Sequence, residues 1–150
     1  MVVKEKNGYK LYPLTVAQKF HFYYQNFCPK KEVLNIGTSV TIGTEIDFNL
    51  LKESIYKAYE RNEFMRIRFT QDDEGNWCQY IVEKEDRDIE YVDFSDKTME
   101  EAEEIMKGWT QVPFERADSP MNRIVMITTS ASVLEHMLLG IDAGNAFHVH

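Results

Sequence analysis

Cysteine is scarce in this chain, which has two among its 150 residues, Cys28 and Cys78. Neither lies in a Cys-x-x-Cys or another metal-like spacing, so the sequence indicates neither a disulfide framework nor a zinc site. Long apolar runs are also missing: no stretch approaches the roughly 20 residues that span a bilayer, and the charged first ten residues do not resemble a signal peptide. We therefore expect a soluble, cytoplasmic protein that does not associate with membranes.

Basic residues are outnumbered, with 17 Lys and Arg against 25 Asp and Glu, for a net charge of −8. Such a balance repels phosphate backbones, so nucleic-acid binding is disfavoured. We interpret the acidic runs as solvated faces. They lie at residues 72–74, 83–88 and 100–104.

Linkers and repeats are missing as well, since the chain has only 7 Gly and 4 Pro and no low-complexity tract. Apolar residues make up 43% of it. A chain of this length buries roughly 70% of the surface that it exposes when unfolded. We therefore predict a single packed domain over residues 1–150.

Three helices are predicted from capping residues and apolar spacing, at residues 16–27, 47–62 and 98–110. Thr15 and Asp47 have side chains that cap the first two, and Thr98 with Glu101 has the spacing of a capping box. Apolar residues recur at helical spacing in each. Those of the first helix are Val16, Phe20, Tyr23 or Tyr24, and Phe27; those of the second are Leu50, Leu51, Ile55, Ala58 and Tyr59; those of the third, expected to face the core, are Met99, Ala102, Met106 and Trp109.

Strands are predicted between these helices from β-branched and aromatic residues. They span residues 33–42, 64–70, 77–82, 89–92, 122–129 and 133–141. Residues 72–76, Asp-Asp-Glu-Gly-Asn, have the composition of a hairpin turn, and Gly37 either weakens its strand or marks a bulge. Helices interleaved with strands and local hairpins predict an α/β or α+β fold, a mixed sheet with helices packed on it.

Three stretches of sequence resemble motifs of one known family. They are Pro-Leu-Thr-Val-Ala-Gln at residues 13–18, Arg-Asn-Glu-Phe-Met-Arg-Ile-Arg-Phe at residues 61–69, and Pro-Phe at 113–114 followed by Pro-Met-Asn-Arg at 120–123. The second is similar to an Arg-His-Glu-x-Leu-Arg-Thr-x-Phe motif, from which it departs at Asn62, Met65 and Ile67. In this order and spacing they resemble the condensation domains of nonribosomal peptide synthetases.

This resemblance implies the amino-terminal lobe of a chloramphenicol acetyltransferase-like fold. It also implies a function in natural product biosynthesis: amide-forming acyl transfer between thioesters held on the phosphopantetheine arms of peptidyl or acyl carrier proteins. A complete domain of this family has two lobes with the active site between them. The implied partners are therefore carrier proteins and the carboxy-terminal lobe, or a second copy of this chain; no intrinsic cofactor or metal is expected.

The motif residues Arg61, Arg66 and Gln18 are interpreted as structural. We expect Arg66 and Arg68 to share one face of a strand, and a buried Arg66 to pair with a carboxylate. Thr15 and Gln18 are interpreted as a helix cap and a first-turn residue rather than as catalytic groups.

The family's catalytic motif, a histidine pair followed three residues later by Asp-Gly, is not recognisable. No register through residues 136–150 places a histidine pair after the last predicted strand. Asp142 and His148 are the weak candidates for a replacement base, and an exposed Asp, with a pKa near 4, would be a poor one. His148 and His150 could meet Asp142 at a metal, but a His-x-His at a chain end is a weak signal. His21, inside the first helix, is expected to be a packed or surface residue.

Three functions therefore stay open. The first is a lobe of an amide-forming acyltransferase, inactive by itself because half of the channel is missing. The second is a noncatalytic module that keeps the fold and binds a carrier protein or partner lobe, which the missing histidines favour. The third, a small trimeric acetyltransferase, also needs the histidine and is therefore less favoured.

Overall fold

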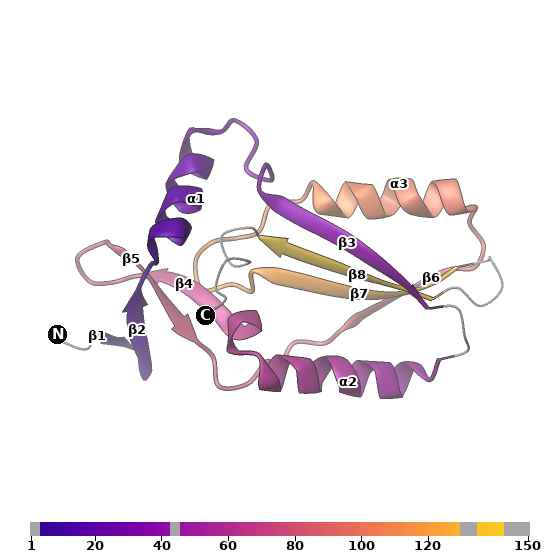
Figure 1. Ribbon diagram of the computed structural model, residues 1–150, viewed down its shortest axis with the longest axis horizontal. Helices are drawn as coiled ribbons and strands as arrows, with labels where there is room; N and C mark the ends of the chain where they lie inside the picture. The colour runs from indigo at the N-terminus through magenta and orange to yellow at the C-terminus, as the bar shows by residue number, and fades with distance from the viewer. Residues whose placement is uncertain (1–3, 43–45, 130–134, 143–150) are drawn as a thin grey trace.

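A computed structural model describes residues 4–42, 46–129 and 135–142, the last of these through the backbone alone. In these ranges two sheets lie side by side, with helices packed against both (Figure 1). The elements are β1 (Lys4–Lys6), β2 (Tyr9–Pro13), α1 (Val16–Phe27), β3 (Asn35–Ile42), α2 (Phe48–Arg61), the 3-10 helix η1 (Glu63–Arg66), β4 (Ile67–Gln71), β5 (Trp77–Ile81), β6 (Glu90–Phe94), α3 (Met99–Thr110), β7 (Asn122–Thr129) and β8 (Glu135–Asp142).

The smaller sheet is antiparallel, with strand order β1-β2-β5-β4. Its first hairpin turns at Asn7 and Gly8, which both have positive φ, 52° and 82°. Asn-Gly is the preferred pair for such a turn, because both residues tolerate the left-handed region. The second hairpin turns at residues 72–76, where the Asp72 carboxylate accepts hydrogen bonds from the backbone N–H groups of Glu74 and Asn76.

The larger sheet has strand order β3-β8-β7-β6, in which β6 and β7 run parallel and the other pairs antiparallel. Strand β7 is apolar on both faces. Val125 and Ile127 pack with Ala102 and Met106 of α3, whereas the alternate residues pack with α2. Those alternate residues are Ile124 and Met126, against Ile55 and Tyr59. Because successive strand side chains point to opposite faces, α2 and α3 cover opposite faces of this sheet.

Gly37 lies in the continuous register between β3 and β8, opposite Gly140, so it does not mark a bulge. A Cβ atom at this position would lie 2.5 Å from the Cγ2 atom of Thr110, the last residue of α3. Real Cβ atoms do not approach other atoms so closely. Glycine is therefore required here by the close packing of the helix end on the strand.

The predicted fold class, helices packed on mixed β-structure, is confirmed, as are the predicted caps of all three helices. Two details are corrected. The strands form two sheets, and residues 64–66 belong to η1 rather than to β4. Over the described ranges, no helix has the length and apolar character needed to cross a bilayer.

Candidate functional site

Strand β8 ends at Asp142, the point after which the family's catalytic motif would follow. The backbone of Asp142 lies opposite Asn35, the first residue of β3, and Ile141 lies opposite Asn122, the first residue of β7. In Figure 1 this end of β8 points to the middle of the molecule, toward α1 and the smaller sheet. His148 falls outside the described residues, and Asp142 is described only by its backbone, so their proposed role as a base stays a prediction.

A buried polar cluster supports the start of β7 beside this strand end. The Tyr59 hydroxyl donates to Asn122 Oδ1 at 2.6 Å, and Asn122 Nδ2 donates to the Met65 carbonyl at 2.8 Å. Arg87 donates to both the Tyr59 hydroxyl and Asn122. Burial raises the pKa of Tyr59, so the phenol stays protonated and keeps its role as a donor. No sequence pattern indicates this cluster, because its members are widely separated along the chain.

Arg66 is buried, but its partners are carbonyl groups and not a carboxylate, so the predicted ion pair is wrong. Its guanidinium donates to the carbonyls of Tyr59 and Glu60 in the last turn of α2 and to those of Val82 and Glu83 after β5. The last carbonyls of a helix lack intrahelical donors and carry its partial negative charge. These carbonyls satisfy the guanidinium, so no carboxylate is needed.

Arg68 forms the ion pair instead. Its Nη2 atom lies 2.7 Å from Glu85 Oε2, and both side chains are almost fully buried, with exposed fractions of 6% and 3%. Arg87 Nε approaches the second oxygen of Glu85 at 3.5 Å. The acidic run at residues 83–88 is therefore not simply a solvated face, since Glu85 lies in the core. Because Arg66 lies in η1, it does not share a strand face with Arg68.

The Ala-Gln motif at the start of α1 is structural, as the sequence predicts. Thr15 and Gln18 form a capping box in which each side chain accepts from the backbone N–H of the other residue. Gln18 is buried, and its Nε2 donates to Gln79 Oε1 at 2.8 Å, which joins α1 to β5. Arg61, the third motif residue, is the last residue of α2 and is exposed.

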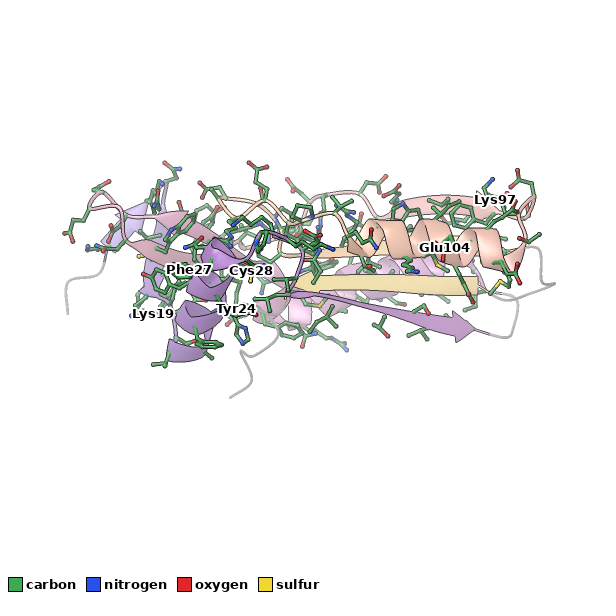
Figure 2. All side chains as sticks on the ribbon, turned by 90° about the horizontal axis from the view of Figure 1, so that it is seen from above. Lys19, Tyr24, Phe27, Cys28, Lys97 and Glu104 are labelled. Atoms are coloured by element: carbon green, nitrogen blue, oxygen red, sulfur yellow. The ribbon has the colours of Figure 1, made fainter. Side chains whose placement is uncertain are left out.

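The apolar stripe of α1 faces away from the described core. Phe22 is the apolar residue of this helix that packs inside, against Phe69 and Trp77. The stripe is formed by Val16, Phe20, Tyr23, Tyr24 and Phe27, each between 47% and 87% exposed. In Figure 2 Tyr24 and Phe27 stand on the surface of the helix. An exposed apolar face of this size is typical of an interaction surface.

The described side chains offer no group suited to proton transfer at the end of β8. His21, the single histidine whose side chain is described, lies on α1 beside Phe20, with 5.6 Å between ring centroids. Within the same part of the chain, no three His, Cys, Asp or Glu side chains are placed to hold a metal. The described geometry therefore supplies a rigid frame around the strand end.

Comparison with known proteins identifies this frame. The model of the condensation domain family matches residues 9–139. Surfactin synthase subunit 1 of Bacillus subtilis (strain 168) is 31% identical over 123 residues, which cover 78% of this chain and 3% of that protein. A linear gramicidin synthase of Brevibacillus parabrevis is 27% identical over 121 residues, which cover 78% and 2%.

Solved structures agree in fold. The starter condensation domain of rhizomide synthetase superposes with a TM-score of 0.78 at 16% identity, over 89% of this chain and 32% of that one. The first condensation domain of the calcium-dependent antibiotic synthetase, in complex with a substrate analogue, gives 0.77 at 17% identity, over 88% and 34%. The fold and motifs are those of a synthetase condensation domain, and this chain belongs to the condensation domain family. It spans about a third of the solved domains and a few per cent of the curated relatives.

Proposed function

We propose that this chain is the amino-terminal lobe of an amide-forming condensation domain, acting on thioesters held by carrier proteins. The observation that carries the proposal is the family match over residues 9–139, together with a strand, β8, that ends where the family's catalytic motif begins. The relatives extend well beyond the part that this chain matches. A second lobe would complete the channel at the end of β8.

The chemistry expected of the complete domain sets what this lobe has to supply. An α-amino group has a pKa near 8, and its attack on a thioester releases a proton that a positioned imidazole accepts near neutral pH. The sequence after β8 contains His148 and His150 but no adjacent histidine pair. The chain's own contribution is then the frame, in which the Tyr59, Asn122 and Arg87 cluster fixes the start of β7 beside β8.

The exposed stripe of α1 supports the same proposal. Phe20 and Tyr24 stack on each other, with ring centroids 6.2 Å apart, on a face that no described residue of the core covers. Since this chain matches about a third of a solved condensation-domain chain, most of such a domain lies outside it. We assign the stripe to contact with the second lobe of the same domain.

A noncatalytic module that binds a carrier protein is the second candidate, and the missing histidine pair favours it. The two functions predict different products. Carrier proteins loaded with a donor and an acceptor thioester are mixed with this chain, and amide product is measured by mass spectrometry. The isolated lobe should form no product above the level without protein, and product formation would overturn the proposal of an inactive lobe.

Binding is the separate test of the module. Calorimetric titration of this chain with an amino-acyl carrier protein should give no saturable heat if the stripe serves only a partner lobe. A saturable interaction that Phe20→Ser and Tyr24→Ser abolish would instead favour the carrier-binding module. Lys57→Gln, an exposed substitution on α2, is the matched control.

A further inference from the structure

A cavity of about 560 Å³ lies away from the end of β8, between the amino-terminal hairpin, α1 and the turn that joins β4 to β5. Small-molecule sites commonly measure roughly 300–1,000 Å³. The apolar part of its wall includes Leu11 and Leu14, which are buried, and Trp77, whose ring packs on Phe22. None of the clusters described above uses this space.

Lysines from three separate elements line the same cavity: Lys4 of β1, Lys10 of β2 and Lys19 of α1. Lys4 is engaged, since its Nζ lies 2.7 Å from Asp72 Oδ2 and 3.2 Å from Glu74 Oε1. Lys10 and Lys19 are exposed, and neither forms an ion pair with a carboxylate of the described residues. Two positive charges therefore border an apolar cavity in a chain whose net charge is −8.

Aromatic side chains lie between the lysines and the apolar floor. Tyr12 and Tyr23 line the cavity, and Lys10 Nζ lies 5.1 Å from the centroid of the Tyr12 ring. Tyr23 is one helical turn from Lys19, so both reach the cavity from one side of α1. In Figure 2 Lys19 and Tyr24 lie on opposite sides of this helix, which separates the cavity from the stripe that contains Tyr24.

The chemistry of the walls selects the class of ligand. An apolar body fits the floor, and a negative head group fits the two lysines. Phosphate groups are commonly held by arginine forks or by the N-terminus of a helix, and the described lining residues include no arginine. Cys78 also lines the cavity, and burial raises the pKa of its thiol, so it stays protonated and is suited to packing rather than to nucleophilic attack.

We propose that this cavity binds a monocarboxylic acid with a long apolar body, of the fatty acid class. Its alkyl chain lies against Leu11, Leu14 and Trp77, and its carboxylate lies between the ammonium groups of Lys10 and Lys19. This site goes beyond the proposed function, because it is separate from the end of β8 and from the stripe of α1. It can therefore be tested in the isolated chain, whether or not the chain takes part in amide formation.

Tryptophan fluorescence measures the binding directly, because Trp77 lines the cavity and Trp109 is the only other tryptophan. In a Trp109→Phe background, titration with decanoate below its micelle concentration should change the emission of Trp77 and reach saturation. Each exposed ion pair contributes about 0.5 kcal/mol, so Lys10→Gln with Lys19→Gln should weaken binding about fivefold. Decanol, which lacks the charge, should bind more weakly than decanoate by a similar factor.

The matched control is Lys57→Gln with Lys107→Gln, which removes two exposed lysines from α2 and α3 and should leave the dissociation constant unchanged. Circular dichroism of each variant establishes that the fold is kept. The proposal is overturned by a titration with decanoate that does not saturate, by equal affinity for decanol, or by a double cavity variant that binds decanoate as tightly as the control. Tighter binding of decyl phosphate than of decanoate would contradict the choice of a carboxylate.

Discussion

Arg68 and Glu85 face each other in the core across 2.7 Å, with more than nine-tenths of each side chain removed from solvent. Removing one partner of a buried pair leaves an uncompensated charge, at a cost of about 3–5 kcal/mol. We therefore expect Glu85→Gln to lower the free energy of unfolding by about 3 kcal/mol, measured by urea denaturation. Glu104→Gln, which breaks the exposed pair with Lys107, should change it by less than about 0.5 kcal/mol.

A double substitution separates the pair from the packing around it. Arg68→Met with Glu85→Leu removes both charges, so it should be less destabilising than Glu85→Gln alone. Equal or greater loss in the double variant would mean that the pair contributes through its shape and packing rather than through its charges.

The ion pair of Lys4 with Asp72 predicts a dependence of stability on pH. The Lys4 ammonium, with the backbone amides of Asn76 and Glu74, lowers the pKa of Asp72 from 3.8 to about 2. A lowered folded-state pKa stabilises the fold at a pH above the unfolded value, and this contribution is lost as the pH falls through the folded one. The difference in urea midpoint between the natural chain and Asp72→Asn should therefore be constant above about pH 4 and shrink between pH 4 and pH 2. A difference that persists at pH 2 would contradict this assignment.

The orientation of α1 predicts a contrast between two neighbouring aromatic residues. Phe22 is 6% exposed and packs against Phe69, whereas Phe20 is 67% exposed. Phe22→Ala should cost about 3–5 kcal/mol of unfolding free energy, and Phe20→Ala less than about 0.5 kcal/mol. Equal losses in thermal or urea unfolding would place the stripe of α1 in the core and remove the basis for an interaction surface there.

Gly37 and Thr110 provide a test of the packing of α3 on β3. Gly37→Ala places a methyl group 2.5 Å from Thr110 Cγ2, so it should cost about 1–3 kcal/mol. Thr110→Ser removes that methyl group and should restore most of the loss. The coupling energy from a double-mutant cycle measures the contact, and additive effects of the two substitutions would contradict it.

How far the sequence predicts this molecule depends on whether the signal is local. Capping residues and apolar spacing act within a few residues, and they located α1, α2 and α3 to within one residue at their starts. The turn of the first hairpin, Asn7-Gly8, is equally local and was detectable from its composition. Its flanking strands are short and charged, so they lack the apolar alternation that predicts a strand, and they were not expected.

The partners of charged and polar groups could not be predicted, because they depend on contacts between distant segments. Glu85 lies within a run of charged residues and has the local signature of a solvated face, yet it is buried against Arg68. Arg66 was expected to pair with a carboxylate, but the end of α2 supplies carbonyls nearer to it. For the candidate site, the motifs located β8 and its end correctly, whereas the cluster of Tyr59, Arg87 and Asn122 beside it had no signal in the sequence.

The most direct test of the central claim is amide formation by this lobe with and without a second one. Residues 1–142 are fused to the histidine motif and carboxy-terminal lobe of the matching condensation domain of surfactin synthase subunit 1, and product from carrier-bound thioesters is measured for the fusion and for the original chain. The account predicts product from the folded fusion and none from the chain alone. Product from the chain alone, or none from a fusion whose circular dichroism shows that it has folded, would contradict it.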